Sequence, residues 1–361
     1  MNQKILINAP RFYGIDEAIR DSWKHLGYQA ILENYRTQST ILEKIVRRLS
    51  VKFPFTSTVF NPILRHYLDF ENKEFLKMIQ REEPDLLFVV KGDHLFPETL
   101  QTIKTLLRIP IIAYIWDDPF YSYAGLYADH YRKTNFEKGM FFYDYIFVYD
   151  PYYVEMIRQR GLPKVKYLPL AGDPERYKYI PISEEDRKTF GFDICFVGVP
   201  YPNRVSVLES LKKYKLGVFG DGWEKYFLRR GKKVPGYYQG KAQGEKVLKI
   251  YRSSKLVLNI HDPEAKEGVN TRTFDILACG ACELVDYKKS LERHFKIGEE
   301  IAVYRNIEEL NNLVAYFLQT PDLIEKISQK GRQRVLNEHT WNHRMEEVAL
   351  TLKQNHLLSV Q

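Results

Sequence analysis

The residues best suited to chemistry lie in one short stretch, where Glu267 and Asp275 are separated by seven residues. Asn270 and Thr271 are residue types that cap helix N-termini. The free N–H groups of a first helical turn and the positive end of the helix dipole favour a phosphate. Arg272 adds a planar set of donors for phosphate oxygens. Asp275 can accept hydrogen bonds from ribose hydroxyls, and Glu267 from those of a sugar. The stretch predicts a site for a nucleotide diphosphate sugar.

Strand-like apolar runs alternate with helical stretches on both sides of this motif, as in 4–8, 16–26 and 256–260 before it and 281–286 after it. Such alternation predicts an α/β fold with parallel sheets covered on both faces. Parallel sheets bind ligands at the carboxyl ends of their strands. Several distinctive loops directly follow predicted strands and are therefore candidate site loops: 8–14, 91–94, 117–118, 198–204, 220–223 and the loop of Glu267.

The chain has 361 residues, which is more than one hydrophobic core usually serves. Residues 171–185 are polar, carry Pro174 and Pro181, and lack a clear periodicity. We therefore expect two Rossmann-like domains joined by a linker and followed by a terminal helix. The predicted ranges are 1–171 for the first domain, 172–190 for the linker, 191–338 for the second domain and 339–361 for the helix.

Composition excludes several classes of protein. A hydrophobic content of 44% and a charged content of 28% are those of a globular protein, not a disordered or fibrous one. No apolar run approaches the roughly 18 residues of a membrane helix, and the start of the sequence lacks a signal-peptide pattern. We expect a cytoplasmic location. The net charge of +8 favours anionic partners, but no nucleic-acid-binding motif accompanies it.

The three cysteines predict neither a disulfide framework nor a metal site. Cys279 and Cys282 form a C-x-x-C pair, which can be redox-active or provide half of a zinc site. No second Cys or His pair with metal-ligand spacing completes it. We expect these residues, with Cys195, to be small packing residues and the protein to bind no metal.

The second half of the chain resembles the group-1 glycosyltransferases of GT-B architecture, and more narrowly the spore-maturation (CgeB-type) glycosyltransferase-like family. The resemblance covers roughly residues 190–350, with a weaker similarity at 147–150 and 167–170. It is carried by segments in a characteristic order: 193–198 with Arg204 downstream, 217–223, 258–260, 270–275, and 339–341 with Arg344.

This resemblance implies two Rossmann-like domains facing each other across a cleft, with the last helix crossing back to the first domain. It implies a UDP-, GDP- or dTDP-linked sugar as donor in 191–338, an acceptor in 1–171, no prosthetic group, retention of configuration and no metal requirement. In the family's Glu-x7-Glu motif, the first residue contacts the hexose and the second the ribose. Glu267 and Asp275 take these places, although Asp275 is one methylene shorter.

The family's Arg and Lys pair, which contacts the donor diphosphate, is not clearly present. We assign Arg204 and Arg272 in its place. Glu267 is the predicted catalytic residue of this half. The predicted donor-binding residues are Gly198, Arg204, Gly220, Trp223, Asn270, Thr271, Arg272 and Asp275.

In the first half, Asp117 and Asp118 follow a predicted strand where group-1 relatives often hold a histidine. Adjacent carboxylates can position an acceptor hydroxyl or share a proton. An aspartate cap beside Pro119 explains them equally well. The candidate acceptor loops Tyr13–Gly14 and Lys91–His94 also follow strands. An ordinary turn explains the first loop equally well, and a solvated turn is the simpler interpretation of the second.

A basic and aromatic segment, 41–64, suggests peripheral contact with an anionic membrane or a lipid-linked acceptor. A solvated helix face is the simpler interpretation.

Together the patterns predict a glycosyltransferase that moves a sugar from a nucleotide diphosphate to a glycan, lipid-linked or protein acceptor. The protein would be cytoplasmic or peripheral at the inner face of the membrane. The alternative is a non-catalytic sugar- or nucleotide-binding protein that keeps the fold, and a basic nucleic-acid module is a weaker third.

Overall fold

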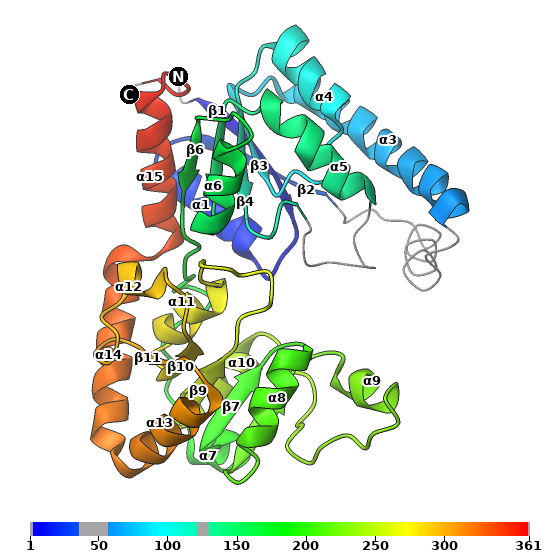
Figure 1. Ribbon diagram of the computed structural model, residues 1–361. Coiled ribbons are helices and arrows are strands. Elements are labelled where there is room, and N and C mark those ends of the chain that lie inside the picture. Colours follow the sequence, from blue (N-terminus) through cyan, green and yellow to red (C-terminus); the bar gives the residue numbers. More distant parts are fainter. Residues whose placement is uncertain (1–2, 36–56, 121–129, 360–361) are drawn as a thin grey trace. The chain divides into compact units, whose positions relative to one another are not determined.

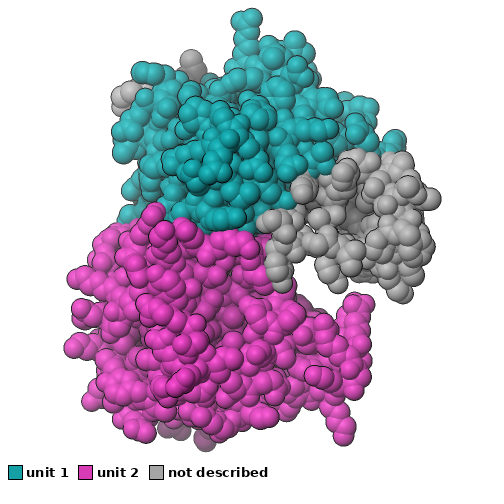
Figure 2. All heavy atoms as spheres, in the orientation of Figure 1, with its two compact units in different colours: residues 1–169, 341–361 teal, residues 170–340 magenta. Residues whose placement is uncertain are grey.

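The computed structural model describes residues 3–35, 57–120 and 130–359 (Figure 1). It divides into two compact units (Figure 2). Unit 1 comprises Met1–Pro169 together with Trp341–Gln361, and unit 2 comprises Leu170–Thr340. The segment 41–64 lies largely outside the described residues, so its predicted membrane contact has no structural description.

Unit 1 contains a six-stranded parallel sheet with the order β2-β1-β3-β4-β5-β6. Its strands are β1 (Lys4–Pro10), β2 (Gln29–Tyr35), β3 (Leu86–Val90), β4 (Ile111–Ile115), β5 (Tyr145–Val148) and β6 (Val165–Tyr167). Every residue of β3 and β4 is buried, as expected for central parallel strands covered on both faces. The α-helices among its described residues are α1 (Ile15–His25), α3 (Ser57–Glu82), α4 (Pro97–Thr102), α5 (His130–Gly139), α6 (Pro151–Arg158) and α15 (Trp341–Gln354).

The last helix, α15, packs against α1 of unit 1, as Figure 1 shows. The rings of Trp341 and Trp116 lie 6.1 Å apart, and Arg344 Nε donates to the carbonyl oxygen of Pro169 at 3.0 Å. Both ends of the chain thus contribute to one unit, and the predicted return of the terminal helix is confirmed.

Unit 2 contains a five-stranded parallel sheet with the order β11-β10-β9-β7-β8. Its strands are β7 (Ile194–Val197), β8 (Leu216–Phe219), β9 (Leu256–Asn259), β10 (Glu283–Asp286) and β11 (Ala302–Tyr304). Its helices are α7 (Glu184–Phe190), α8 (Pro202–Ser210), α9 (Trp223–Leu228), α10 (Glu245–Ser253), α11 (Thr271–Ala278), α12 (Leu291–His294), α13 (Ile307–Gln319) and α14 (Pro321–Glu338). The predicted α/β class with parallel sheets is confirmed in both units.

Helix α7 lies within the range that the sequence suggested as a linker. Ser183 Oγ accepts from the Asp186 N–H at 3.0 Å, and the Asp186 carboxylate accepts from Ser183 in return, so a capping box begins the helix. None of the α7 residues is buried. A helix without a buried face has no apolar periodicity, which is why the sequence pattern missed it.

The three cysteines are free and buried in unit 2. Burial raises the pKa of each thiol to about 12. No helix in the described part of the chain is long and apolar enough to cross a membrane. Within the same residues, no group of three His, Cys, Asp or Glu side chains is arranged to hold a metal ion.

Candidate functional site

The N-terminus of α11 is built as the sequence predicted. Asn270 adopts an extended backbone, and its side chain accepts a hydrogen bond from the Thr273 N–H at 3.3 Å. Helix α11 therefore begins with Thr271 and Arg272 in its first turn, and both are half-buried. The N–H groups at this end provide the expected partial positive charge.

Beneath this first turn lies a buried polar network that the sequence analysis did not identify. Asn259, the last residue of β9, donates through Nδ2 to Glu283 Oε1 at 2.8 Å and to Thr273 Oγ1 at 3.0 Å. The Thr273 hydroxyl also donates to Glu283 Oε1, at 3.0 Å. Arg272 Nη1 donates to Asn259 Oδ1 at 3.2 Å. The network therefore fixes both the start of the helix and the guanidinium of Arg272.

Glu283 is the acidic member of this network and has no exposed area. Burial raises the pKa of Glu283 to about 8, against the lowering effect of its bonds to Asn259 and Thr273. The sequence held one signal of this buried carboxyl, which was a charged residue in the otherwise apolar run 283–285.

His261 holds the loop before α11. Its Nε2 accepts from the Asn270 N–H at 3.2 Å, so the ring proton lies on Nδ1 and faces Asp286 Oδ1 at 2.8 Å. Burial opposes ionisation of Asp286, but the interactions with His261 outweigh it and hold the pKa of Asp286 below its usual range. His261 and Asp286 thus connect the end of β10 to the cap of α11.

The two predicted arginines lie in the same region of unit 2. Their guanidinium carbons are 5.7 Å (Arg204) and 5.9 Å (Arg272) from the centroid of the Phe196 ring. Burial, and then the charge of Arg272, lower the pKa of Arg204 to about 10. Two neighbouring cations favour an anion beside them, because it relieves their mutual repulsion.

The two arginines differ in their available donors. Arg204 is only 3% exposed, and it donates from Nε to the Ile260 carbonyl oxygen at 3.0 Å and from Nη1 to that of Val199 at 3.1 Å. It therefore fixes the loop after β7 as well as supplying charge. Arg272 is half-buried, so it is the better placed of the two to contact a ligand.

Two predicted glycines allow the loops after β7 and β8 to approach each other. A Cβ on Gly220, whose φ is 135°, would lie 2.2 Å from the Gly198 carbonyl oxygen. A Cβ on Gly198 would lie 2.9 Å from the Phe196 ring and 3.3 Å from Arg272 Nη2. Any side chain at Gly198 would therefore crowd the guanidinium of Arg272.

Trp223, predicted to bind the donor, lies in the core of unit 2 and has no exposed area. Its ring packs edge to face on Phe196 and stacks on Phe227. Its Nε1 donates to the Gly198 carbonyl oxygen at 2.7 Å. The indole is therefore in place to position the loop after β7.

The two acidic residues of the motif have different surroundings. The Glu267 side chain is 31% exposed, and its Oε1 lies 3.6 Å from Lys289 Nζ. Asp275 is 8% exposed, and its Oδ1 accepts from the Asp173 N–H at 3.3 Å. Burial raises the pKa of Asp275 well above its usual range. Glu267 is thus the more accessible of the pair.

The candidate acceptor residues of unit 1 have different surroundings. Lys91 pairs with Asp117, and its Nζ lies 5.6 Å from the Phe12 ring. Asp118 is buried, and its Oδ1 accepts from the Phe120 N–H at 2.9 Å, as in an aspartate-capped turn.

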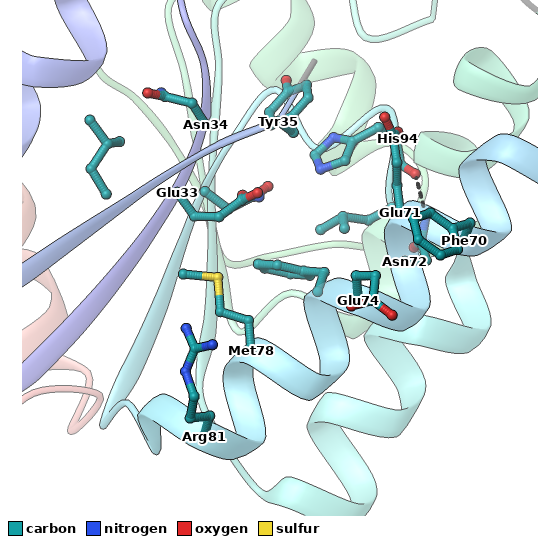
Figure 3. A pocket seen from close by; sticks show the side chains of 14 residues that line it. Glu33, Asn34, Tyr35, Phe70, Glu71, Asn72, Glu74, Met78, Arg81 and His94 are labelled. Carbon is teal, nitrogen blue, oxygen red and sulfur yellow. Dashed lines mark hydrogen bonds between the residues drawn. The ribbon is translucent and has the colours of Figure 1, made fainter. Parts of the chain in front are cut away.

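The remaining three candidates also differ in their surroundings. Tyr13 is 69% exposed with φ 50°, and Gly14 (φ 82°) is the N-cap of α1. His94 is buried and stacks on Tyr35 with ring centroids 3.5 Å apart. Both rings line a pocket of about 450 Å³ in unit 1 (Figure 3).

Comparison with known proteins shows which families and folds the chain is similar to. Residues 204–349 match the family described as glycosyl transferase-like. The chain is 23% identical to spore protein CgeB of Bacillus subtilis over 303 residues, which cover 79% of this chain and 86% of CgeB. It is 26% identical to an uncharacterized protein of Aquifex aeolicus over 129 residues, 32% of each chain.

Solved structures share the fold over nearly the whole chain. Sucrose-phosphate synthase from Thermosynechococcus elongatus aligns with a TM-score of 0.68 at 11% identity, covering 98% of this chain and 99% of its own. HepE from Anabaena, in complex with UDP and glucose, aligns with a TM-score of 0.64 at 11% identity, covering 98% and 100%.

Two parallel α/β units and these alignments define the GT-B architecture, as predicted. Over residues 204–349 the chain is also similar to the glycosyl transferase-like family. Within the class it is similar to the CgeB-type proteins, which confirms the resemblance drawn from the sequence motifs.

Proposed function

We propose that the protein transfers a sugar from a nucleotide diphosphate to an acceptor hydroxyl, and that unit 2 binds the donor. The observation that carries the proposal is the guanidinium of Arg272 at the capped start of α11, beside Arg204 and the glycine loops after β7 and β8. UDP is the first nucleotide to test, because HepE was solved with UDP and with UDP-glucose.

In this proposal the residues act mainly through electrostatics. Arg272 and the N–H groups of α11 stabilise the negative charge that develops on the leaving diphosphate. Arg204 adds positive charge and holds the loop after β7. Glu267 orients the donor sugar and Asp275 binds the ribose. The proposal also includes transfer with retention of the anomeric configuration of the sugar and without a metal ion. These two points rest on the family resemblance alone.

The acceptor is proposed to bind in unit 1, with Lys91 and Asp117 at the strand ends as its contacts. A glycan, a lipid-linked sugar or a protein can supply the hydroxyl. Location in the cytoplasm or at the inner face of a membrane belongs to the same proposal, as does membrane contact through 41–64.

A second candidate function is sugar or nucleotide binding without turnover. Two observations favour it: the raised pKa and burial of Asp275, and the two backbone carbonyls that already occupy Arg204. Both reduce the number of polar groups available to a donor. The two candidates differ in whether a bound sugar nucleotide is consumed.

Calorimetric titration with UDP and with uridine tests the donor site. For Arg272→Ala we expect UDP affinity to fall on the order of tenfold while uridine affinity changes little, because a charge-assisted bond to phosphate is lost. Arg305→Ala is the control, since Arg305 is exposed and pairs with Glu309. Equal losses for UDP and uridine would remove Arg272 from the phosphate role.

Turnover is measured as release of nucleotide from the sugar nucleotide, with and without chelator. Glu267→Ala is expected to lower turnover by at least about tenfold while nucleotide binding persists, because the donor sugar loses its orientation. Normal turnover in this variant contradicts the assignment of Glu267. Binding with no turnover of any sugar nucleotide in the wild-type protein supports the non-catalytic alternative.

A further inference from the structure

The guanidinium of Arg272 is oriented by one side chain and keeps most of its donors unused. Its Nη1 donates to Asn259 Oδ1 at 3.2 Å. Within the described part of the chain, Arg272 makes no other hydrogen bond and no ion pair with a carboxylate. Most of its N–H groups therefore remain for a ligand. The single bond to Asn259 is what holds the group that the donor site needs.

Asn259 has a buried amide whose two ends bond to different partners. It is the last residue of β9 and has no exposed area. Its Oδ1 accepts from Arg272 and also from Asn270 Nδ2, at 3.3 Å. Its Nδ2 donates to Glu283, Thr273 and Asn270 Oδ1, the last at 3.0 Å. An amide suits this position because it offers an acceptor and a donor on one planar group.

The sheet of unit 2 fixes the lower end of these bonds. Asn259 lies opposite Val285 in the parallel register of β9 and β10, and Glu283 precedes Val285 by two positions. Alternate residues of a strand point to the same side, so Glu283 and Asn259 share one face of the sheet. Thr273 of α11 donates to Glu283 Oε1 at 3.0 Å, which connects the helix to the same carboxyl. Asn259 thus places the guanidinium relative to two strands and a helix.

The groups around Arg272 do not cancel its charge. The amide of Asn259 is uncharged. Glu283 is fully buried, and burial raises its pKa to about 8, so the carboxyl is mostly protonated at neutral pH. Burial also holds the pKa of Asp275, one turn further along α11, well above its usual range. A guanidinium beside ionised carboxylates is partly neutralised, whereas this one keeps its charge for a phosphate.

We propose that Asn259 is the positioning residue of the donor site in unit 2. Its uncharged amide holds the Arg272 guanidinium at the first turn of α11 and leaves the charge of the guanidinium to the diphosphate. A carboxylate at this position would compete with the phosphate for the same arginine. This role rests on the proposed function, because it takes Arg272 as a diphosphate contact. Residue 259 should therefore affect diphosphate affinity only through Arg272.

Calorimetric titration of the full chain with UDP and with uridine at pH 7 tests this role in a double-mutant cycle. Asn259→Ala should lower UDP affinity about fivefold or more and uridine affinity less than about twofold, because a loosely held guanidinium makes weaker bonds to phosphate. In the Arg272→Ala background, the same change should leave UDP affinity within about twofold. Equal losses of UDP affinity in both backgrounds would overturn the proposal, since Asn259 would then act on α11 as a whole.

A second variant and a control accompany the cycle. Asn259→Ser is expected to behave like Asn259→Ala, because a serine hydroxyl ends closer to the backbone and leaves Arg272 without its partner. It is used so that loss of folding in one variant leaves the other. Asn311→Ala is the control, because Asn311 lies on α13 and donates to the Ile307 carbonyl oxygen at 2.9 Å. Its UDP affinity should equal that of the wild type.

Glu283→Gln tests whether the groups that orient Arg272 are uncharged. Glutamine keeps an acceptor oxygen and has no charge, so UDP affinity at pH 7 should stay within about twofold of the wild type. A clear gain in UDP affinity would mean that an ionised Glu283 partly neutralises Arg272 in the wild type, and this would contradict the proposal.

The Arg272→Ala variant separates this inference from the proposed function. Weaker UDP binding in Arg272→Ala but unchanged binding in both Asn259 variants overturns the role of Asn259 alone. Absence of UDP binding to the wild type, or unchanged UDP affinity in Arg272→Ala, removes the donor site and the role of Asn259 with it.

Discussion

Replacement of Glu283 by glutamine is expected to change how the stability of unit 2 depends on pH. The side chain is fully buried beneath α11, and its pKa rises from the ordinary 4.5 to about 8. The folded protein therefore keeps a proton that the unfolded chain releases above pH 4.5. Because the folded state binds more protons across this window, each increase in pH between about 4.5 and 8 lowers the free energy of unfolding.

The size of the effect follows from the same pKa difference. One pKa unit corresponds to about 1.4 kcal/mol, so between pH 5.5 and 8.5 the wild-type protein should lose on the order of 3 kcal/mol through this one carboxyl. Glutamine at 283 has no proton to release. It keeps an acceptor oxygen for Asn259 and Thr273, so any packing penalty is the same at every pH.

The assay is urea unfolding at pH 5.5, 7.0 and 8.5, with hydrogen exchange of the amides in β9, β10 and α11 to assign the change to unit 2. Glu283→Gln should lose clearly less stability than the wild type over this range. Glu299→Gln is the control, because Glu299 is exposed and its hydrogen bond with Lys330 lowers its pKa. Parallel pH profiles for Glu283→Gln and the wild type would refute the reasoning.

Two further predictions concern unit 2. Gly220→Ala should lower the free energy of unfolding by more than about 2 kcal/mol, because a Cβ there meets the Gly198 carbonyl oxygen and the backbone has φ 135°. Thermal unfolding measures the loss of stability, and UDP titration measures its effect on binding. A variant with unchanged stability would contradict the close approach of the two loops. Thiol titration of the native protein at pH 8 should show no rapid reaction at Cys195, Cys279 or Cys282, because burial raises each thiol pKa to about 12. Reaction faster than unfolding would indicate an accessible thiolate.

The sequence alone predicted the fold class and the start of α11. Alternating apolar runs and helical stretches require parallel sheets between helices, because each element must bury its apolar face. Asn270 marks a helix start through local chemistry, since its side chain accepts from the Thr273 N–H three residues further along the chain. These features depend on neighbours in the sequence, so the sequence was sufficient to find them.

The polar network below α11 depended on tertiary structure. Asn259, Thr273 and Glu283 come from β9, α11 and β10, and only the order of the strands in the sheet brings them together. The same holds for Arg204. Its type suggested phosphate binding, but its bonds to two backbone carbonyls follow from where β7 and β9 end.

What the sequence determined was the class of protein and the type of each candidate residue, because motif and periodicity are local. Only the tertiary structure decided which side chains are buried, which share a hydrogen-bond network and which carboxyls hold their protons. Burial and proximity of residues far apart in the chain set those properties, and the burial of Glu283 beneath α11 has no local signature in the sequence.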